Sequence, residues 1–159
     1  MVGKLSHEIE VLNVPASEAW ELYGTLRLGK LIVEEAFPGV IEKIEKIEGD
    51  GEAGTIVKII PAGTTGSKAY REKFTKVDNE KRLKELEVIE GAYLEMGFTF
   101  YRVSFEIVEK GNDSCIIKTT VEYDVKEEAA ANASNVVSIE PFAKVAEAAK
   151  NHLLKNKTA

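Results

Sequence analysis

The sequence is poor in the residues that crosslink chains or bind metal ions. Among 159 residues it has one cysteine, Cys115, and two histidines, His7 and His152. One cysteine excludes an intrachain disulfide, and a structural zinc site, which needs about four Cys or His ligands, is close to excluded. No apolar run approaches the length of about 18 residues that a membrane-spanning helix needs, and residues 1–7 contain no apolar stretch of signal-peptide length. We therefore expect a cytosolic protein without a metal and without a membrane partner.

Basic residues are in deficit. The chain has 27 acidic and 21 basic residues and a formal charge of −6. Nucleic acids and anionic membranes both require a basic face, so neither is expected as the main partner, whereas a neutral or cationic small molecule is permitted. The hydrophobic share of 44% and the charged share of 30% are those of a globular protein. At this length we expect residues 1–159 to form one domain.

The hydrophobic patterns predict an α+β fold. Alternation of apolar and polar residues predicts strands over 5–11, 40–48, 55–60, 68–77, 81–90, 98–108 and 115–125. Helical spacing predicts two short helices, over 15–24 and 28–36, and a long C-terminal helix over about 127–155 that is irregular near 132–141. The expected structure is a curved, seven-stranded antiparallel sheet wrapped around the long helix. Small barrels of this kind often hold one ligand, so an internal hydrophobic cavity is also expected.

Two neighbouring strands place ionisable residues on their inward faces. In 68–77, Tyr70, Glu72 and Phe74 share the aromatic face, and in the next strand Lys84 lies on the same side as Leu86. Because an isolated buried charge is costly, Glu72 and Lys84 are expected to pair or to shift their pKa values. A glutamate in a cavity can exchange protons, and a lysine can hold a carbonyl oxygen or act as a base. Alternation alone nevertheless favours a structural ion pair at the mouth of the barrel.

The segment Gly49-Asp50-Gly51-Glu52-Ala53-Gly54-Thr55 superficially resembles a phosphate-binding loop. It lacks the Gly-Lys-Ser/Thr ending, its carboxylates would repel a phosphate, and it lies between two predicted strands. We therefore interpret it as a tight hairpin that uses the backbone freedom of glycine.

Several motifs resemble those of a known protein family. The glycine-rich loop and the order of elements along nearly the whole chain resemble the birch-pollen-allergen superfamily, also called the class-10 pathogenesis-related proteins. Three segments of the chain are similar to the central block of plant norcoclaurine synthases: Tyr-Arg-Glu-Lys-Phe at 70–74, Asp-Asn-Glu-Lys-Arg-Leu-Lys at 78–84 and Ile-Glu-Gly-Ala-Tyr-Leu at 89–94. The resemblance implies that catalytic Tyr, Glu and Lys residues fall on Tyr70, Glu72 and Lys84.

A second resemblance bears on the product. Residues 5–8, 22–28 and 130–134 are similar to segments of norbelladine synthases. Synthases that complete a Pictet–Spengler ring closure carry an aspartate at the position of Val103. Norbelladine synthases have an aliphatic residue there and mainly join an aromatic aldehyde to tyramine as an imine. The resemblance therefore implies imine formation and leaves ring closure open.

These resemblances imply the condensation of an aromatic aldehyde with a phenethylamine such as tyramine or dopamine, by a monomer or weak dimer. Neither a metal nor an organic cofactor is needed, because imine formation requires only proximity, desolvation and proton transfer. The alternative is a non-catalytic protein that binds or stores apolar plant metabolites or phytohormones in defence, which would be indifferent to Glu72 and Lys84. Six further side chains are expected to line the substrate cavity: Phe74, Leu86, Phe98, Tyr101, Val103 and Phe142.

Overall fold

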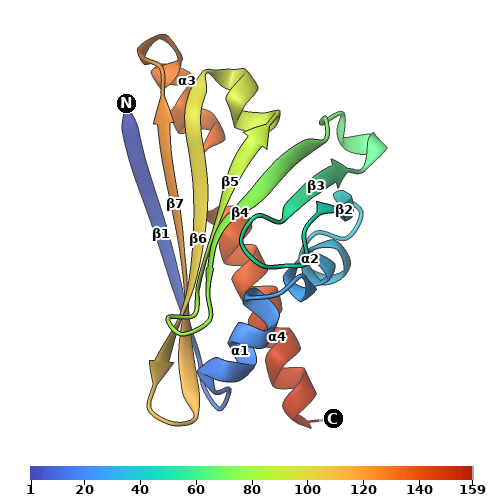
Figure 1. The fold of residues 1–159 in the computed structure, drawn as a ribbon, viewed down its shortest axis with the longest axis vertical. Helices are drawn as coiled ribbons and strands as arrows, with labels where there is room; N and C mark the ends of the chain where they lie inside the picture. Colours follow the sequence, from blue (N-terminus) through green and yellow to red (C-terminus); the bar gives the residue numbers. More distant parts are fainter. Residues whose placement is uncertain (159) are drawn as a thin grey trace.

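Seven antiparallel strands form one curved sheet in the computed structural model, which describes residues 1–158 (Figure 1). The strands β1 to β7 span Val2–Val11, Ile41–Glu48, Ile56–Pro61, Tyr70–Asp78, Leu83–Glu90, Phe98–Lys110 and Ser114–Val125. Their order in the sheet is β1-β7-β6-β5-β4-β3-β2, so β2 to β7 form a meander and β1 adds to its far edge. The predicted α+β class and the predicted seven-stranded sheet are confirmed.

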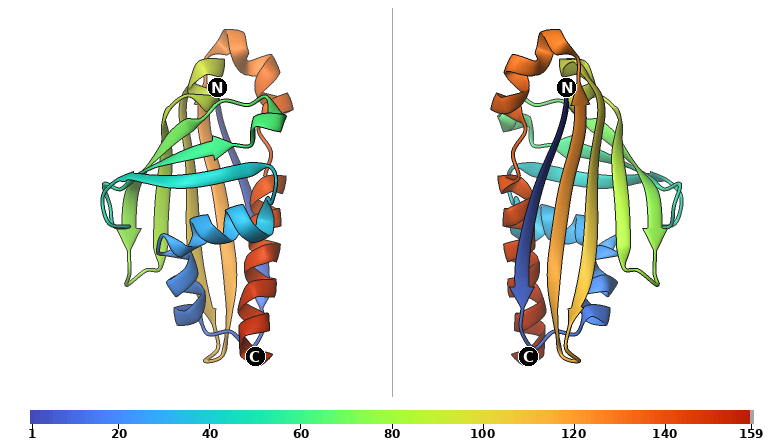
Figure 2. Two further views of the ribbon diagram at one scale, coloured as in Figure 1. Left: turned by 90° about the vertical axis from the view of Figure 1, so that its right-hand side faces the viewer. Right: turned by 90° about the vertical axis from the view of Figure 1, so that its left-hand side faces the viewer.

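Helices close the concave side of this sheet. The short helices α1 (Ala16–Tyr23) and α2 (Arg27–Leu31) are followed by a π-helical turn, η1 (Ile32–Ala36). The long helix α4 (Glu140–Thr158) contacts β1, β7, α1 and η1, and Figure 2 shows it running along the sheet beside β1. Two 3₁₀ turns, η2 (Gly63–Thr65) and η3 (Ala92–Met96), connect strands at one end. Within residues 1–158 no helix combines the length and apolarity needed to cross a bilayer.

The C-terminal region contains the predicted long helix, α4, and the irregularity predicted near 132–141 is a break in the helical backbone. It consists of a 3₁₀ turn, η4 (Glu127–Ala129), the short helix α3 (Ala130–Val136) and then α4, with an extended backbone at Val137. The start of α4 explains the break. The backbone N–H of Glu140 donates to Oγ of Ser138 at 3.1 Å, and Pro141 occupies the first turn, where its missing N–H has no partner to lose.

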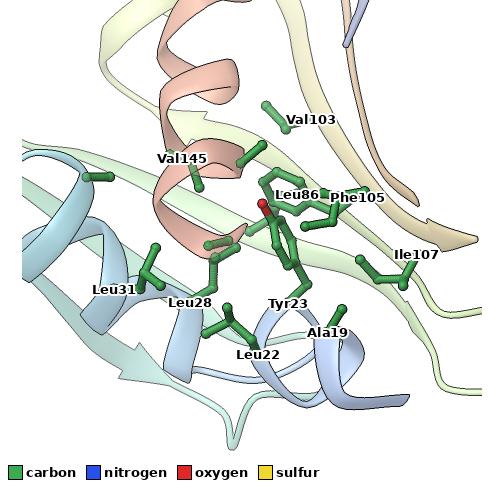
Figure 3. Close-up of a cluster of buried hydrophobic side chains, with 14 of the residues drawn as sticks. Ala19, Leu22, Tyr23, Leu28, Leu31, Leu86, Val103, Phe105, Ile107 and Val145 are labelled. Carbon is green, nitrogen blue, oxygen red and sulfur yellow. The ribbon is translucent and has the colours of Figure 1, made fainter. Parts of the chain in front are cut away.

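The core lies where α1, α2 and α4 meet the β5–β7 part of the sheet. Figure 3 shows its side chains converging from α1 (Leu22, Tyr23), α2 (Leu28) and β6 (Phe105, Ile107). Alternate residues of β6 and β7 are buried, as the period of a strand requires. The other half of the concave face, formed by β2 to β5, is incompletely filled and contains the candidate site.

Candidate active site

A cavity of about 420 Å³ lies between the concave face of the sheet and the helical segments α2, η1 and α4. Most of its inner wall is apolar and comes from Val57, Ile59, Phe74, Leu86, Val103, Phe105 and Phe142. Glu72 and Lys84 are the two ionisable residues on this inner wall, whereas the other charged residues that line the cavity are exposed at its rim. Strand alternation therefore brings both predicted ionisable residues into one cavity.

Glu72 reaches the cavity from the first half of β4. Its neighbours across the sheet are Val57 in β3 and Val88 in β5, so the carboxyl group lies among apolar side chains. Burial raises the pKa of Glu72 to about 7, and the positive charge of Lys84 partly opposes that rise. A carboxyl with this pKa is populated in both its protonated and ionised forms near neutral pH, as a proton-transfer group requires.

Lys84 is held at the floor of the cavity by the end of α1. Its side chain is 2% exposed, and its Nζ donates hydrogen bonds to the backbone carbonyl oxygens of Tyr23 at 3.1 Å and Thr25 at 3.2 Å. Carbonyls that follow the last turn of a helix lack intrahelical partners and carry its negative dipole end, so an ammonium group is stabilised there. The Nζ also lies 4.2 Å from the centroid of the Phe74 ring. An ammonium has three N–H donors, so one remains for a ligand.

The sequence patterns did not predict the two carbonyl groups that anchor Lys84. Gly24, which ends α1, was the available signal, because a helix end exposes carbonyl groups. Burial lowers the pKa of Lys84 to about 8, and Glu72 opposes that change. Lys84 is therefore mostly protonated at neutral pH and able to donate.

The direct ion pair that alternation favours is not formed. Within residues 1–158, no contact of 4.0 Å or less joins the carboxylate of Glu72 to Nζ of Lys84. Each group shifts the pKa of the other through space, while both face the same cavity. An acid and an ammonium that do not neutralise each other by contact are free to act on one ligand.

Tyr70 lies outside this cavity. It faces a neighbouring cavity of about 570 Å³ near η3, together with Tyr93, and Ile59 borders both cavities. In the sheet Ile59 lies directly opposite Tyr70, so Tyr70 and Glu72 share a face of β4 but open into different spaces. Burial raises the pKa of Tyr70, which keeps its phenol protonated and able to donate a hydrogen bond.

Four of the six expected lining residues, Phe74, Leu86, Val103 and Phe142, are on the wall of the cavity that holds Glu72. Tyr101 and Phe98, which we also expected there, lie in a neighbouring aromatic cluster instead. The ring of Tyr101 stacks on Tyr93 with centroids 3.9 Å apart, and Phe98 contacts Tyr93 edge-on. The two residues are three positions apart, so strict alternation would place them on opposite faces of β6, and a bulge between Phe98 and Phe100 allows both to be buried. Periodicity also does not say which part of a long strand lies beside a cavity.

The arrangement suits carbonyl chemistry. Within the described part of the chain, residues 1–158, no three His, Cys, Asp or Glu side chains are grouped so that they could hold a metal ion. A buried ammonium can stabilise negative charge on a carbonyl oxygen, and the neighbouring carboxyl can give and take a proton.

The chain is similar to known synthases along nearly its whole length. Norbelladine synthase of Narcissus pseudonarcissus is 48% identical over 159 residues, covering 99% of this chain and 96% of that protein. S-norcoclaurine synthase 1 of Papaver somniferum is 38% identical over 97% of this chain and 66% of its own length. The structure of norcoclaurine synthase from Thalictrum flavum in complex with dopamine and hydroxybenzaldehyde superposes with a TM-score of 0.85, at 37% identity over 98% of this chain and 88% of that chain. Residues 1–156 match the sequence profile of one family. The chain thus belongs to the pathogenesis-related protein Bet v 1 family.

Proposed function

We propose that the protein condenses an aromatic aldehyde with a phenethylamine, such as tyramine or dopamine, to an imine. One observation carries this proposal: a protonatable carboxyl and a buried ammonium face one apolar cavity without contacting each other. The similarity to a norbelladine synthase and to norcoclaurine synthases supports the same reaction class. The similar structure that holds dopamine and hydroxybenzaldehyde supports the choice of substrates.

In the proposed reaction Lys84 stabilises negative charge on oxygen, and Glu72 transfers protons. The free N–H of Lys84 donates to the aldehyde oxygen and stabilises the negative charge that develops there as the neutral amine attacks the carbonyl carbon. One proton of the attacking nitrogen passes to this oxygen, which gives the neutral carbinolamine. Protonated Glu72 then donates a proton to the departing hydroxyl, and the C–O bond breaks to release water as the C=N bond forms. The remaining proton on the nitrogen of the iminium returns to the carboxylate of Glu72 and leaves the neutral imine. Aldehyde and amine thus give imine and water, and the apolar walls exclude bulk water that would reverse the step.

Two further residues affect substrate binding and the expected product. Tyr70, kept protonated by burial, would donate a hydrogen bond to a substrate hydroxyl that extends past Ile59 into the neighbouring cavity. Val103 is 2% exposed and supplies no second carboxyl on the wall of the catalytic cavity. We therefore expect the imine as the main product, with Glu72 the base available for any subsequent ring closure.

The test follows product formation from tyramine and 3,4-dihydroxybenzaldehyde by mass spectrometry, with a reductant present to trap the imine. Glu72→Gln and Lys84→Met are each expected to lower the rate by about 10² or more, because each removes a proton donor from the transition state. The matched controls are Glu85→Gln and Lys73→Met, which change the same residue types at positions outside the cavity lining. Both should retain the rate.

A rate that is unchanged in both cavity variants, or no rate above buffer, would exclude this reaction and favour the alternative. That alternative is a non-catalytic binding protein for apolar metabolites, which the apolar walls also suit. Cytosolic location and a monomeric or weakly dimeric state remain part of the proposal.

A further inference from the structure

The position of the Lys84 ammonium group depends on the junction between α1 and α2. Its Nζ donates to the carbonyl oxygens of Tyr23 and Thr25, the residues on either side of Gly24 at the end of α1. Both acceptors are backbone atoms, so they lie where the junction lies. Because α1 and the strand that carries Lys84, β5, are far apart in the chain, contacts that hold the two together also position the ammonium group.

The indole ring of Trp20 packs directly against this junction. A Cβ placed on Gly24 would lie 2.4 Å from Cε2 and 2.6 Å from Cζ2 of Trp20, far inside van der Waals contact. The backbone of Gly24 is helical, with a φ of −80°, so its conformation does not require glycine. The close approach of the indole ring requires it instead. Trp20 is 9% exposed and thus covers the residue between the two anchoring carbonyls.

The indole N–H connects the junction to the turn that precedes Lys84. Nε1 of Trp20 donates a hydrogen bond to Oδ1 of Asn79 at 2.9 Å. Asn79 lies in the turn between β4 and β5, which Figure 1 shows beside α1. Asp78 fixes this turn, because its carboxylate accepts from two backbone N–H groups of the turn, each at 3.0 Å. The acceptor for the indole N–H is therefore presented by an ordered segment.

We propose that Trp20 and Asn79 are positioning residues for the condensation. Their hydrogen bond holds the end of α1 against the β4–β5 hairpin and so keeps the two anchoring carbonyls beside the Lys84 ammonium group. This proposal rests on the proposed function. Neither side chain is among those that line the catalytic cavity, so both act through Lys84 and not on the substrates.

The effect on the reaction follows from the role of Lys84. Hydrogen bonds weaken steeply as their length and angle depart from the optimum, so a displaced junction loosens the ammonium group. Lys84 stabilises negative charge that develops as the carbonyl is attacked, and a donor that is out of place loses that stabilisation. An interaction made mainly in the transition state affects kcat more than KM.

Asn79→Ala removes the acceptor, and because Asn79 is exposed in a turn, the variant should fold. With tyramine and 3,4-dihydroxybenzaldehyde, kcat should fall about fivefold or more, while KM for each substrate stays within about twofold. Asn79→Asp keeps an acceptor for the indole N–H and should retain the rate. The matched control is Glu80→Ala, because this exposed residue contributes its backbone N–H to the same turn. An unchanged rate in Asn79→Ala, or equal losses in Asn79→Ala and Glu80→Ala, would overturn the proposal.

A double variant distinguishes positioning of Lys84 from a general effect on the fold. If Asn79 acts through the ammonium group, Asn79→Ala should change the remaining rate by no more than about twofold once Lys84→Met has removed that group. The same fivefold loss in both backgrounds would show that Asn79 acts elsewhere and would overturn the proposal.

A measurement on the ammonium group itself separates this proposal from the proposed function. Burial and hydrogen bonding slow the exchange of the Lys84 Nζ hydrogens with water, which heteronuclear NMR of the lysine side chains follows. Exchange should accelerate about fivefold or more in Asn79→Ala and stay at the wild-type rate in Asn79→Asp. If exchange accelerates but the wild type condenses no substrates, the proposed reaction fails and the hydrogen bond still positions Lys84. Unchanged exchange in Asn79→Ala would overturn the positioning role.

Discussion

At the scale of single residues, the site depends on how Lys84 is kept charged in an apolar cavity. Two backbone carbonyls and the Phe74 ring replace water around its ammonium group. Burial still disfavours the charge, and the pKa of about 8 reflects this balance. Burial favours the neutral form of Glu72 as well, and because that form is the protonated one, the pKa of Glu72 moves in the opposite direction, up to about 7. The proton-transfer capacity of the site thus comes from desolvation more than from pairing.

Removal of Lys84 should make Glu72 harder to ionise. The positive charge of Lys84 lowers the pKa of Glu72 against the larger effect of burial, so Lys84→Met should raise that pKa above 7. A titration of the labelled Glu72 carboxyl carbon by NMR measures this directly and does not require activity. Lys73→Met, on the exposed side of β4, should leave the pKa of Glu72 unchanged. A pKa that falls in Lys84→Met would contradict the account of the site.

At the scale of elements, the loop between β2 and β3 is a side-chain-stabilised hairpin, as its glycines predict. Thr55 is 1% exposed, and its hydroxyl accepts from the backbone N–H of Gly51 at 2.8 Å and donates to the carbonyl oxygen of Glu52 at 2.7 Å. A Cβ on Gly49 would lie 2.7 Å from Cα of Thr55, so only glycine fits at this position. The loop thereby sets the pairing of β2 and β3 beside the cavity.

Thr55→Val keeps the shape of the side chain and removes both hydrogen bonds. It should lower the free energy of unfolding by about 1–3 kcal/mol, because the buried N–H of Gly51 loses its acceptor and the carbonyl oxygen of Glu52 loses one of its two donors. Urea unfolding measures the change. The matched control is Thr75→Val, whose exposed hydroxyl makes one hydrogen bond of 3.3 Å and should change stability little. Equal effects of the two substitutions would show that the loop hydrogen bonds do not stabilise the fold.

At the scale of the whole molecule, Glu72 lowers stability as the pH rises. Its pKa is about 7 in the folded protein against an ordinary value of 4.5 for a solvated glutamate. The folded state therefore holds the proton more tightly, so the contribution of this group is complete below pH 4.5 and is lost as the pH rises through 7.

Glu72→Gln removes this dependence. Relative to the wild type, the variant should gain up to about 3 kcal/mol of unfolding free energy between pH 5 and pH 8, since one unit of pKa corresponds to about 1.4 kcal/mol. Urea unfolding of both proteins at the two pH values gives the difference, and the other titrating groups cancel in the comparison. Glu85→Gln, at a position outside the cavity lining, serves as the control. The prediction would be contradicted if the unfolding free energy of the variant, taken relative to the wild type, were lower at pH 8 than at pH 5.

The sequence by itself determined which residues face inward. Alternation has a period of two along any strand, so it placed Glu72, Phe74, Lys84 and Leu86 on the cavity side without knowledge of their partners. The seven strands and the short helices followed from the same local patterns. The motifs shared with alkaloid synthases then selected Glu72 and Lys84 from the inward-facing residues.

Only the tertiary structure decided what those residues meet. The anchoring of Lys84 by carbonyls at the end of α1 and the wall of Ile59 between two cavities depend on contacts between segments far apart in the chain. The same is true of the close approach of Gly29 in α2 to Ile44 in β2. Local periodicity carries no information about such contacts, because it specifies the face on which a side chain lies but not the segment that packs against it.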